Sequence, residues 1–344
     1  MNISYLGVIA VCAAASFVLT AIVRQLALRR GALSSPNERS SHVHPTPSSG
    51  GLGFLSVFVA SLLFLLVFQY LPTAHHPFMV PLLVATVFTG LLGFVDDCFE
   101  LSARFRLLVH LVCAVILVFS LPQPMVYDLG FLVSDLGVLS SILGILGIMW
   151  LLNLTNFMDG IDGLAAVQAI LVCGIVVVLI GLTSQETVYA YPVALLGAGV
   201  LGFLFWNLPP ARIFMGDVGS GTLGLLFGGF ALWHAAELGP HWLYVWLLLL
   251  GILVVDATYT LLRRLLRNCS PTRAHRSHAY QRASRKFESH TKVTFACAAI
   301  VVFWLGPWAW GVAAQKINGL LALAVAYVPL LLIAKYFKAG ELDD

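Results

Sequence analysis

Five aspartates interrupt this apolar sequence at three places, each beside a long hydrophobic run. Asp96 and Asp97 are adjacent, Asp159 and Asp162 lie three residues apart, and Asp217 stands alone in a Gly-rich turn. Adjacent carboxylates repel each other, so both stay ionised only beside a cation, basic side chains or water. Acids are costly next to apolar spans and usually serve a function there. A solvated helix end is the alternative for the adjacent pair; we expect all five acids to form one polar site.

The middle acids belong to a regular pattern. Asn156, Asp159 and Asp162 recur every three residues, so on a helix they would share one face. Gly160 and Gly163 remove side chains next to that face and would let a ligand approach the backbone. This pattern favours a site for a hydroxylated or cationic ligand over its alternative, a water-exposed turn between two spans.

Asp217 lies within the sequence Gly-Asp-Val-Gly-Ser-Gly, directly before an apolar run. Successive backbone N–H groups at a helix start bind phosphate well, and a nearby carboxylate can hold Mg²⁺ against that phosphate. The turn lacks the Gly-Lys-Ser/Thr sequence of a P-loop. It therefore indicates a phosphate site of another kind.

His275 and His278 lie three residues apart in the most basic loop, beside Arg273, Arg276 and Arg282. No third His or Cys is suitably spaced for zinc. A patch that binds a diphosphate is the more natural interpretation, although a solvated basic loop would explain the arginines alone. Carboxylates with a cation, a phosphate-binding turn and a basic loop together indicate phosphoryl transfer, in which the protein mainly positions reactants and neutralises charge.

The elements that position these residues are membrane spans. The chain has 344 residues, of which 60% are hydrophobic and 10% charged. A bilayer core needs about 20 apolar residues per helix. We expect one all-α polytopic membrane domain over residues 1–344 with 10 or 11 transmembrane helices. The candidate ranges are 3–23, 50–71, 78–95, 106–121, 136–152, 163–183, 190–207, 219–236, 242–262, 293–314 and 317–337.

The basic residues predict the orientation, because Lys and Arg favour cytoplasmic loops. With eleven spans, all of the 19 Lys and Arg except Lys316 fall on one side, together with all five aspartates. We therefore expect a periplasmic N-terminus, a cytoplasmic C-terminus and an active site on the cytoplasmic face of the inner (plasma) membrane. The first run has no basic leader and is read as a retained span. The six cysteines form no CxxC pair.

Asp256 lies inside the ninth range. A buried acid paired with a neighbouring helix or with Arg263 is favoured over a proton relay.

Taken together, these aspartate, glycine and histidine motifs are similar to those of a known family. The chain resembles the polyprenyl-phosphate N-acetylhexosamine-1-phosphate transferases, glycosyltransferase family 4. The Asp96-Asp97 pair, residues 153–163 and residues 214–219 match in order and spacing, and the stretch His275–Arg282 resembles the WbpL-type branch that starts O-antigen synthesis. The resemblance covers essentially the whole chain. It implies transfer of a sugar 1-phosphate from a UDP-N-acetylhexosamine to undecaprenyl phosphate in the bilayer, with release of UMP.

The resemblance also implies roles for individual residues. Asn156 and Asp217 would hold Mg²⁺, with Mn²⁺ as a substitute, on the diphosphate. Asp96 and Asp97 would deprotonate or orient the lipid phosphate.

On the nucleotide side, Asp159 and Asp162 would contact the substrate, and Phe214 would stack on uracil. His275 and His278, with Arg276, would bind the diphosphate or the sugar. The expected catalytic set is Asp96, Asp97, Asp159, Asp162 and His275. The expected substrate-binding set is Asn153, Phe214, Gly216, Arg276, His278 and Arg282.

Two positions depart from the family pattern. Many relatives have Lys where Glu100 stands, so Arg104 or Arg106 would have to supply that charge, and many have Arg where Ser48 stands. The basic loop favours UDP-N-acetylfucosamine, UDP-N-acetylquinovosamine or UDP-GlcNAc over a muramyl pentapeptide substrate. A cation- or proton-coupled transporter is the alternative, but transporters place acids near the bilayer midplane and often show repeats. An inactive scaffold is less consistent with the intact set of acids. Nothing indicates a nucleic-acid partner, and a homodimer stays open.

Overall fold

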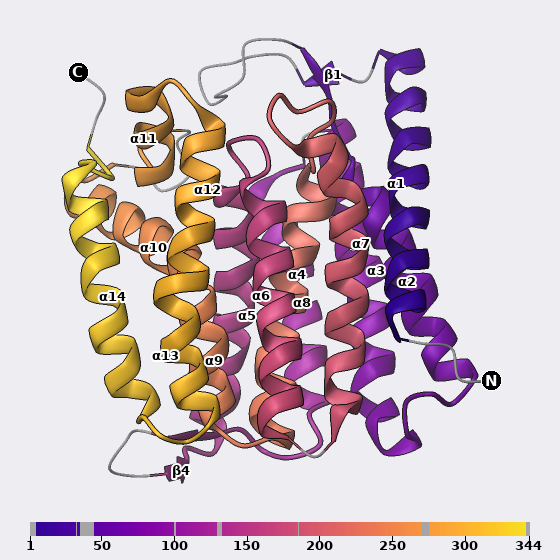
Figure 1. Ribbon diagram of the computed structural model, residues 1–344, viewed down its shortest axis with the longest axis vertical. Helices are drawn as coiled ribbons and strands as arrows, with labels where there is room; N and C mark the ends of the chain where they lie inside the picture. The colour runs from indigo at the N-terminus through magenta and orange to yellow at the C-terminus, as the bar shows by residue number, and fades with distance from the viewer. Residues whose placement is uncertain are drawn as a thin grey trace.

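The computed structural model describes residues 5–31, 33–34, 45–99, 101–128, 133–184, 186–269 and 275–341. This part of the chain is almost wholly helical, and most of its helices stand side by side along the long axis (Figure 1). Its β structure is two short antiparallel pairs, β1 (Leu33–Ser34) with β2 (Thr46–Pro47) and β3 (Val126–Asp128) with β4 (Val133–Asp135). The predicted all-α fold class is confirmed.

Fourteen α-helices are defined in the described residues. Their bounds are α1 Tyr5–Arg30, α2 Gly51–Val67, α3 His76–Phe99, α4 Ala103–Phe119, α5 Val138–Met158, α6 Leu164–Thr183, α7 Tyr191–Asn207, α8 Asp217–Glu237, α9 His241–Leu249, α10 Gly251–Leu266, α11 Ala279–Phe287, α12 His290–Ile300, α13 Gly306–Ala313 and α14 Gly319–Tyr336. Short 3₁₀ turns at Thr73–His75 and Thr187–Ala190 precede α3 and α7, and a π-helical turn at Val301–Leu305 joins α12 to α13.

All eleven predicted ranges are helical, but not all are complete straight spans. By length and composition, seven helical segments of the described chain could cross a membrane, or eight if the bent pair α9–α10 is one span. That pair bends by 75° at a one-residue break, so the ninth range is not the single straight helix that we expected. Helix α2 is apolar but, with 17 residues, is shorter than the about 20 residues of a typical span.

Helix α8 is the centre of the bundle. All its residues from Val218 to Ala235 are buried, and it contacts α2, α3, α4, α5 and α9. Small residues allow this close packing, as in many membrane helix pairs. A Cβ atom on Gly93 would lie 2.5 Å from the backbone nitrogen of Val218, and one on Gly224 would lie 2.5 Å from the carbonyl oxygen of Leu151. The ends of α3 and α5 are therefore held against the start of α8.

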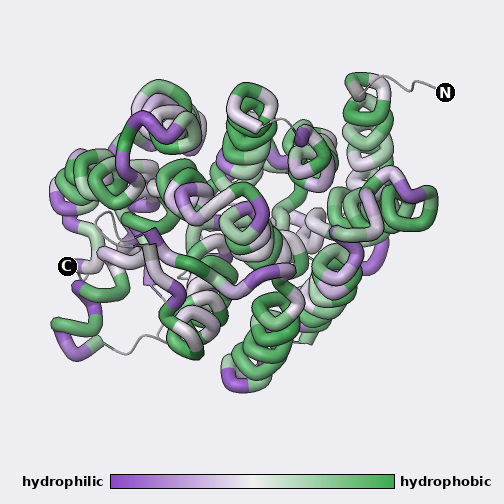
Figure 2. Tube along the Cα trace, turned by 90° about the horizontal axis from the view of Figure 1, so that it is seen from below, coloured by the Kyte–Doolittle hydropathy of each residue, from purple (hydrophilic) through white to green (hydrophobic). Residues whose placement is uncertain are grey.

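The described chain starts and finishes at opposite ends of the bundle. Helix α1 begins at the lower end of Figure 1 and α14 ends at the upper end, where α11 also lies. Viewed from below, the helices are predominantly apolar along their length (Figure 2). Opposite ends fit an odd number of passes, as in the eleven-span prediction. The side of the membrane on which each end lies stays a prediction.

Candidate active site at the start of helix α8

Asp217, the first residue of α8, is the hub of the acidic cluster. Asn156 at the end of α5 donates its Nδ2 hydrogen to Asp217 Oδ1 at 2.8 Å, and Arg106 on α4 donates from Nη1 to Oδ2 at 3.0 Å. The backbone N–H of Asp217 donates to Asp97 Oδ1 at 2.8 Å. Helices α3, α4 and α5 thus converge on the first residue of α8.

The two members of the Asp96-Asp97 pair face different partners. Asp96 is buried and accepts hydrogen bonds from Arg106 Nη1 and, at 2.6 Å, from the backbone N–H of Leu101. Asp97 also accepts from the hydroxyl of Ser49 at 2.7 Å. The Arg106 guanidinium therefore bridges Asp96 and Asp217, which offsets the repulsion among the acids.

Gly216 has a steric reason to be glycine. Its φ is +74°, a conformation that favours glycine, and a Cβ atom would collide with the Asp97 carboxylate and lie 2.9 Å from the Ser49 nitrogen. Ser48, at one of the positions that depart from the family pattern, lies beside the same glycine, since its Oγ would be 3.0 Å from that Cβ. The other such position, Glu100, and residues 35–44 lie outside the described residues.

A cavity of about 760 Å³ opens beside this cluster. Its size is that of a small-molecule site. Among the residues expected from sequence, Asp96, Asn153, Asn156, Asp217, His275 and His278 line it. Arg106, His110, Trp150, Tyr280 and Gln281 line it as well. The cavity thus joins the acidic cluster to the histidine loop, two regions more than 50 residues apart in the chain.

The prediction that Asn156, Asp159 and Asp162 share one helical face is wrong. Helix α5 ends at Met158, and Asp159 is its non-helical cap residue. The chain then turns through Gly160 to Gly163, whose φ of +75° precedes α6. Because α5 ends before Asp159, the three-residue spacing has no helical meaning here.

The turn directs Asp162 away from Asp217. Its Oδ2 accepts from the backbone N–H of Ala211 at 3.0 Å, and its Oδ1 lies 3.4 Å from His290 Nδ1 on α12. Thr294 donates its hydroxyl to the Asp162 carbonyl oxygen at 3.1 Å. In this structure Asp162 fastens the turn to α12 and to the loop before α8.

Burial and mutual repulsion raise the pKa of two acids. Burial raises the pKa of Asp217 to about 7, with further contributions from Asp96 and Asp97. Burial, together with the charges of Asp217, Asp97 and Asp162, raises the pKa of Asp159 well above its usual range. Strongly perturbed carboxyls beside a cavity are typical of functional sites, because unneutralised charge there favours binding of a cation.

The histidine loop leads into α11. The His275 and His278 rings lie 5.0 Å apart, and the hydroxyl of Ser277 and His275 Nδ1 are 3.0 Å apart. Burial, with the nearby His278 and Arg264, lowers the pKa of His275 to about 3, so its imidazole is neutral at pH 7. Tyr280 donates its hydroxyl hydrogen to the Phe157 carbonyl at 2.8 Å, which joins α11 to the acidic turn.

Four expected substrate contacts do not line the cavity, namely Phe214, Gly216, Arg276 and Arg282. Phe214 pairs its backbone with Pro47 and Gly50, both at 2.8 Å, before α8. Arg282 donates from Nη2 to the Glu341 carbonyl at 2.6 Å, towards the C-terminal segment. Arg285 Nη1 donates to the Arg276 carbonyl at 2.9 Å, so the backbone of Arg276 braces α11.

Sequence patterns missed several contributors. His110 lies four residues after Arg106, a helical spacing that could have revealed it. Asp256 is buried, as expected, but Arg263 pairs with Glu341 at 2.5 Å and not with Asp256. No sequence pattern pointed to Ser49 or His290, because each is distant in sequence from the aspartate that it contacts, Asp97 and Asp162 respectively.

The side chains at this site suit a magnesium ion that is held partly by substrate better than a metal ion that is held by protein side chains alone. The described residues contain no group of three or more His, Cys, Asp or Glu side chains that could hold a metal. Mg²⁺ at phosphoryl-transfer sites is usually held by one or two protein groups together with substrate phosphates and water. Asp217 supplies a carboxylate, and a half-turn of the Asn156 amide would present its oxygen beside it. These two residues therefore fit a magnesium ion completed by a diphosphate.

Comparison with known proteins identifies the family of the chain. Residues 79–235, which include α3 to most of α8, match the family described as glycosyl transferase family 4. A decaprenyl-phosphate N-acetylglucosaminephosphotransferase of Mycobacterium tuberculosis is 30% identical over 87% of this chain and 80% of its own length. The chain belongs to glycosyl transferase family 4.

Other members of glycosyl transferase family 4 are similar as well. A probable undecaprenyl-phosphate N-acetylglucosaminyl 1-phosphate transferase of Bacillus subtilis is 28% identical over 84% of this chain and 78% of its own length. A phospho-N-acetylmuramoyl-pentapeptide-transferase of Carboxydothermus hydrogenoformans is 28% identical over 63% of this chain and 69% of its own length. The resemblance of the sequence motifs to this family is confirmed, and this chain covers 78% and 69% of the lengths of these two relatives.

Proposed function

We propose that this protein transfers an N-acetylhexosamine 1-phosphate from a UDP-sugar to undecaprenyl phosphate and releases UMP. Family membership and the names of the relatives support the general reaction, sugar-phosphate transfer to a polyprenyl phosphate. The observation that carries the proposal to this chain is the single cavity that joins Asp96, Asn156 and Asp217 to His275 and His278. Such a site can hold a diphosphate between an acidic end and a histidine end.

The reaction needs the lipid phosphate and the UDP-sugar to meet in line. An oxygen of the lipid phosphate attacks the β-phosphorus, the bond from that phosphorus to the bridging oxygen breaks, and UMP leaves with the bridging oxygen. Asn156 and Asp217 are the groups that would hold Mg²⁺, which when bound supplies charge neutralisation on the diphosphate. Asp96 lines the cavity, and in this proposal it is the member of the pair that orients the lipid phosphate.

The other groups have supporting roles in this proposal. Asp97 is occupied by the Asp217 backbone and by Ser49, so it fixes the start of α8. Arg106 offers a guanidinium to phosphate oxygens, the charge that the missing family lysine would otherwise supply. Neutral His275, with His278, would donate hydrogen bonds to the diphosphate or the sugar.

We further propose direct attack by the lipid phosphate without a covalent enzyme intermediate. Every acid of the cluster is already engaged in hydrogen bonds or shielded by burial, which suits orientation better than nucleophilic attack. Isolation of a sugar-phosphate or nucleotide adduct on any aspartate would contradict this mechanism.

The substrate sugar is proposed as UDP-N-acetylfucosamine, UDP-N-acetylquinovosamine or UDP-GlcNAc, for the start of O-antigen or another envelope polysaccharide. In support, relatives named for N-acetylglucosamine align over 84% and 87% of this chain, against 63% for the muramoyl-pentapeptide relative.

The direct test is product formation in detergent. Purified protein, radiolabelled UDP-HexNAc, undecaprenyl phosphate and Mg²⁺ should give a lipid-linked diphosphosugar and UMP. Asp217→Asn keeps the shape of the side chain but loses its charge, and should lower kcat by about 10²–10³, the size typical of a lost electrostatic contact in an active site. Absence of product with the wild type and every UDP-HexNAc would contradict the proposed function.

A further inference from the structure

Asp256 is a buried carboxylate in the middle of α10, away from the acidic cluster. Its side chain is 8% exposed and receives three hydrogen bonds. Oδ1 accepts from the backbone N–H of Ala279 at 2.9 Å and from the Thr260 hydroxyl at 3.1 Å, and Oδ2 accepts from the backbone N–H of Tyr280 at 3.0 Å. Two of these donors are the first residues of α11.

This contact ties the start of α11 to α10. The first N–H groups of a helix have no partner within the helix, and a carboxylate there is favoured by the helix dipole. Helix α11 has nine residues, too few to be stable by itself in water. Its position therefore depends on anchors, and Asp256 holds its first turn while Tyr280 holds Phe157.

The same carboxylate faces the cavity histidine. His278 immediately precedes α11, is 3% exposed, and lies with Nδ1 3.4 Å from Asp256 Oδ1. His278 also lines the cavity beside Asp217. This contact is not a hydrogen bond, so the carboxylate acts on the Nδ1 side of the ring through its charge, and Nε2 is the ring nitrogen left for a ligand.

We propose that Asp256 is a positioning residue of the active site that acts through His278. It fixes the first turn of α11 and the Nδ1 side of the imidazole, and thereby presents Nε2 to the UDP-sugar. This inference rests on the proposed function for its substrate. This positioning role of Asp256 differs from that of a purely structural anchor, whose loss would affect folding and the binding of both substrates alike. It also differs from that of a proton relay, which would not need the imidazole ring to be held in one orientation.

A double-mutant cycle separates these roles. Kinetic constants are measured for the wild type, Asp256→Asn, His278→Gln and the double variant. Loss of a residue that orients a ligand from behind typically costs about 10–100-fold. Asp256→Asn should therefore raise the KM for the UDP-sugar about tenfold and leave the KM for undecaprenyl phosphate unchanged.

In the double variant, Asp256→Asn should add nothing to the loss caused by His278→Gln, because residues that act as a unit are not additive. Losses that multiply, or an equal rise in both KM values, would overturn the proposal.

A gentler variant covers the case in which Asp256→Asn does not fold. Ala279→Pro keeps the Asp256 carboxylate and removes one of its hydrogen-bond donors, the backbone N–H of residue 279. Proline suits the first position of a helix. His278 has φ −66° and ψ 149°, a conformation that suits a residue before proline. The KM for the UDP-sugar should rise in this variant, and again not in the His278→Gln background. An additive effect would contradict the proposal.

A second readout does not depend on activity. Diethylpyrocarbonate modifies accessible neutral imidazoles, and mass spectrometry gives the rate at each histidine. In Asp256→Asn the modification rate of His278 should rise several-fold. The modification rate of His76, which begins α3 at the end away from Asp96 and Asp97, should stay unchanged. An unchanged His278 rate would overturn the positioning role. If the wild type forms no product with any UDP-HexNAc, the proposed function fails and this rate alone decides the role of Asp256.

Discussion

Charge balance around one guanidinium organises the site at the scale of residues. Arg106 contacts both Asp96 and Asp217, whereas Asn156 and the Asp97 carboxylate complete the surroundings of Asp217. Burial, together with the neighbouring carboxylates, raises the pKa of Asp217 and Asp159. A second cation, such as the proposed Mg²⁺, would complete the neutralisation.

His275 gives a prediction for the pH dependence of stability. Its pKa is lowered to about 3 in the folded protein, so between pH 3 and the ordinary value of about 6.5 the unfolded chain binds more protons than the folded one. Stability is therefore lost as pH falls through this window. At pH 5.5 the loss is at most about 1.4 kcal/mol, and smaller at this half-buried site.

His275→Gln removes that loss. Relative to the wild type, the variant should gain up to about 2 °C in the thermal midpoint at pH 5.5, and nothing at pH 7.5. Thermal unfolding in detergent at both pH values measures this difference. Asp159 and Asp217 change the pH dependence of stability in the opposite sense, since their pKa values are raised. Both acids are present in the wild type and in the variant, so their contributions cancel in the difference between the two thermal midpoints. A midpoint difference that is equal at the two pH values would contradict the prediction.

Sequence patterns predicted which residues meet, but not how each one is used. Asp96, Asn156 and Asp217 were expected together and do converge. Asp162 was expected beside them, yet it faces Ala211 and His290, because α5 ends at Met158 before the three-residue spacing can act as a helical face. Such outcomes depend on loop conformation and on partners more than 40 residues away, which spacing in the chain does not encode.

At the scale of elements, close packing of α3 on α8 places the Asp96-Asp97 pair against Asp217. Gly93 lies at this contact, because a Cβ atom there would be 2.5 Å from the Val218 nitrogen and 2.6 Å from the Asp217 carbonyl oxygen. Both of these atoms belong to the backbone of α8, so neither can move without shifting the helix. Separation of the two helices would lengthen the hydrogen bond from the Asp217 N–H to Asp97.

Gly93→Ala should therefore reduce both stability and activity. Overpacking typically costs about 1–3 kcal/mol, and transfer activity should fall further because Asp217 is displaced. Gly147→Ala is the matched control: Gly147 lies exposed on α5 with nothing within 4 Å of an added Cβ, and should gain about 1 kcal/mol or less from helix propensity. Thermal midpoints and initial rates measured in parallel test this. Equal behaviour of the two variants would mean that the α3–α8 contact is not tight.

Element positions were more predictable than element shapes. Apolar runs located every long helix, since hydropathy reports burial in lipid or protein directly. The 75° bend between α9 and α10 was not foreseen, because Leu250 and Gly251 sit inside a continuous apolar run. The bend carries Asp256 to the start of α11, so a feature without a sequence signal positions part of the site.

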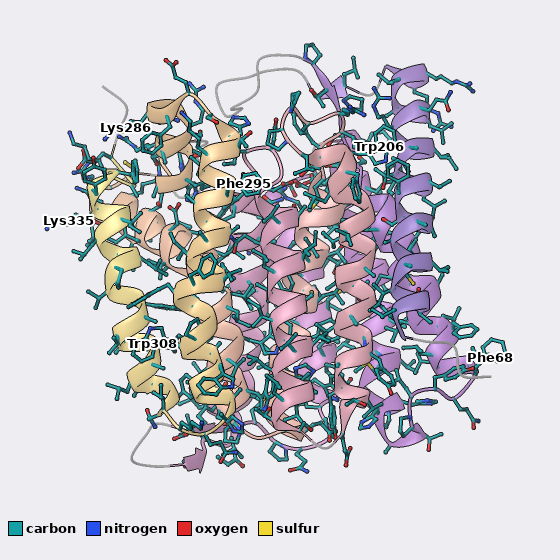
Figure 3. All side chains as sticks on the ribbon, in the orientation of Figure 1. Phe68, Trp206, Lys286, Phe295, Trp308 and Lys335 are labelled. Carbon is teal, nitrogen blue, oxygen red and sulfur yellow. The ribbon has the colours of Figure 1, made fainter. Side chains whose placement is uncertain are left out.

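At the scale of the whole molecule, one end carries the acids, the histidine loop and most of the basic side chains. Lys286 and Lys335 lie at the upper end in Figure 3, with Trp206, whereas Phe68 lies at the lower end. Since basic residues favour the cytoplasmic side, this end is predicted to face the cytoplasm. A nucleotide sugar made in the cytoplasm would then reach the cavity without crossing the bilayer.

Cysteine labelling tests this orientation in intact cells. Cys98 is exposed at the end of α3, Cys269 is partly exposed, and the other four cysteines are buried. In a Cys269→Ser background, Cys98 should react with a membrane-impermeant maleimide only after the inner membrane is permeabilised. Thr187→Cys, made with Cys98→Ser and Cys269→Ser, places a thiol on the exposed 3₁₀ turn before α7 at the opposite end, and should react without permeabilisation. The reverse pattern would place the acidic site outside the cytoplasm and would contradict the predicted orientation. The two variants each carry one accessible thiol and differ in the end of the bundle at which that thiol lies, so each serves as the control for the other.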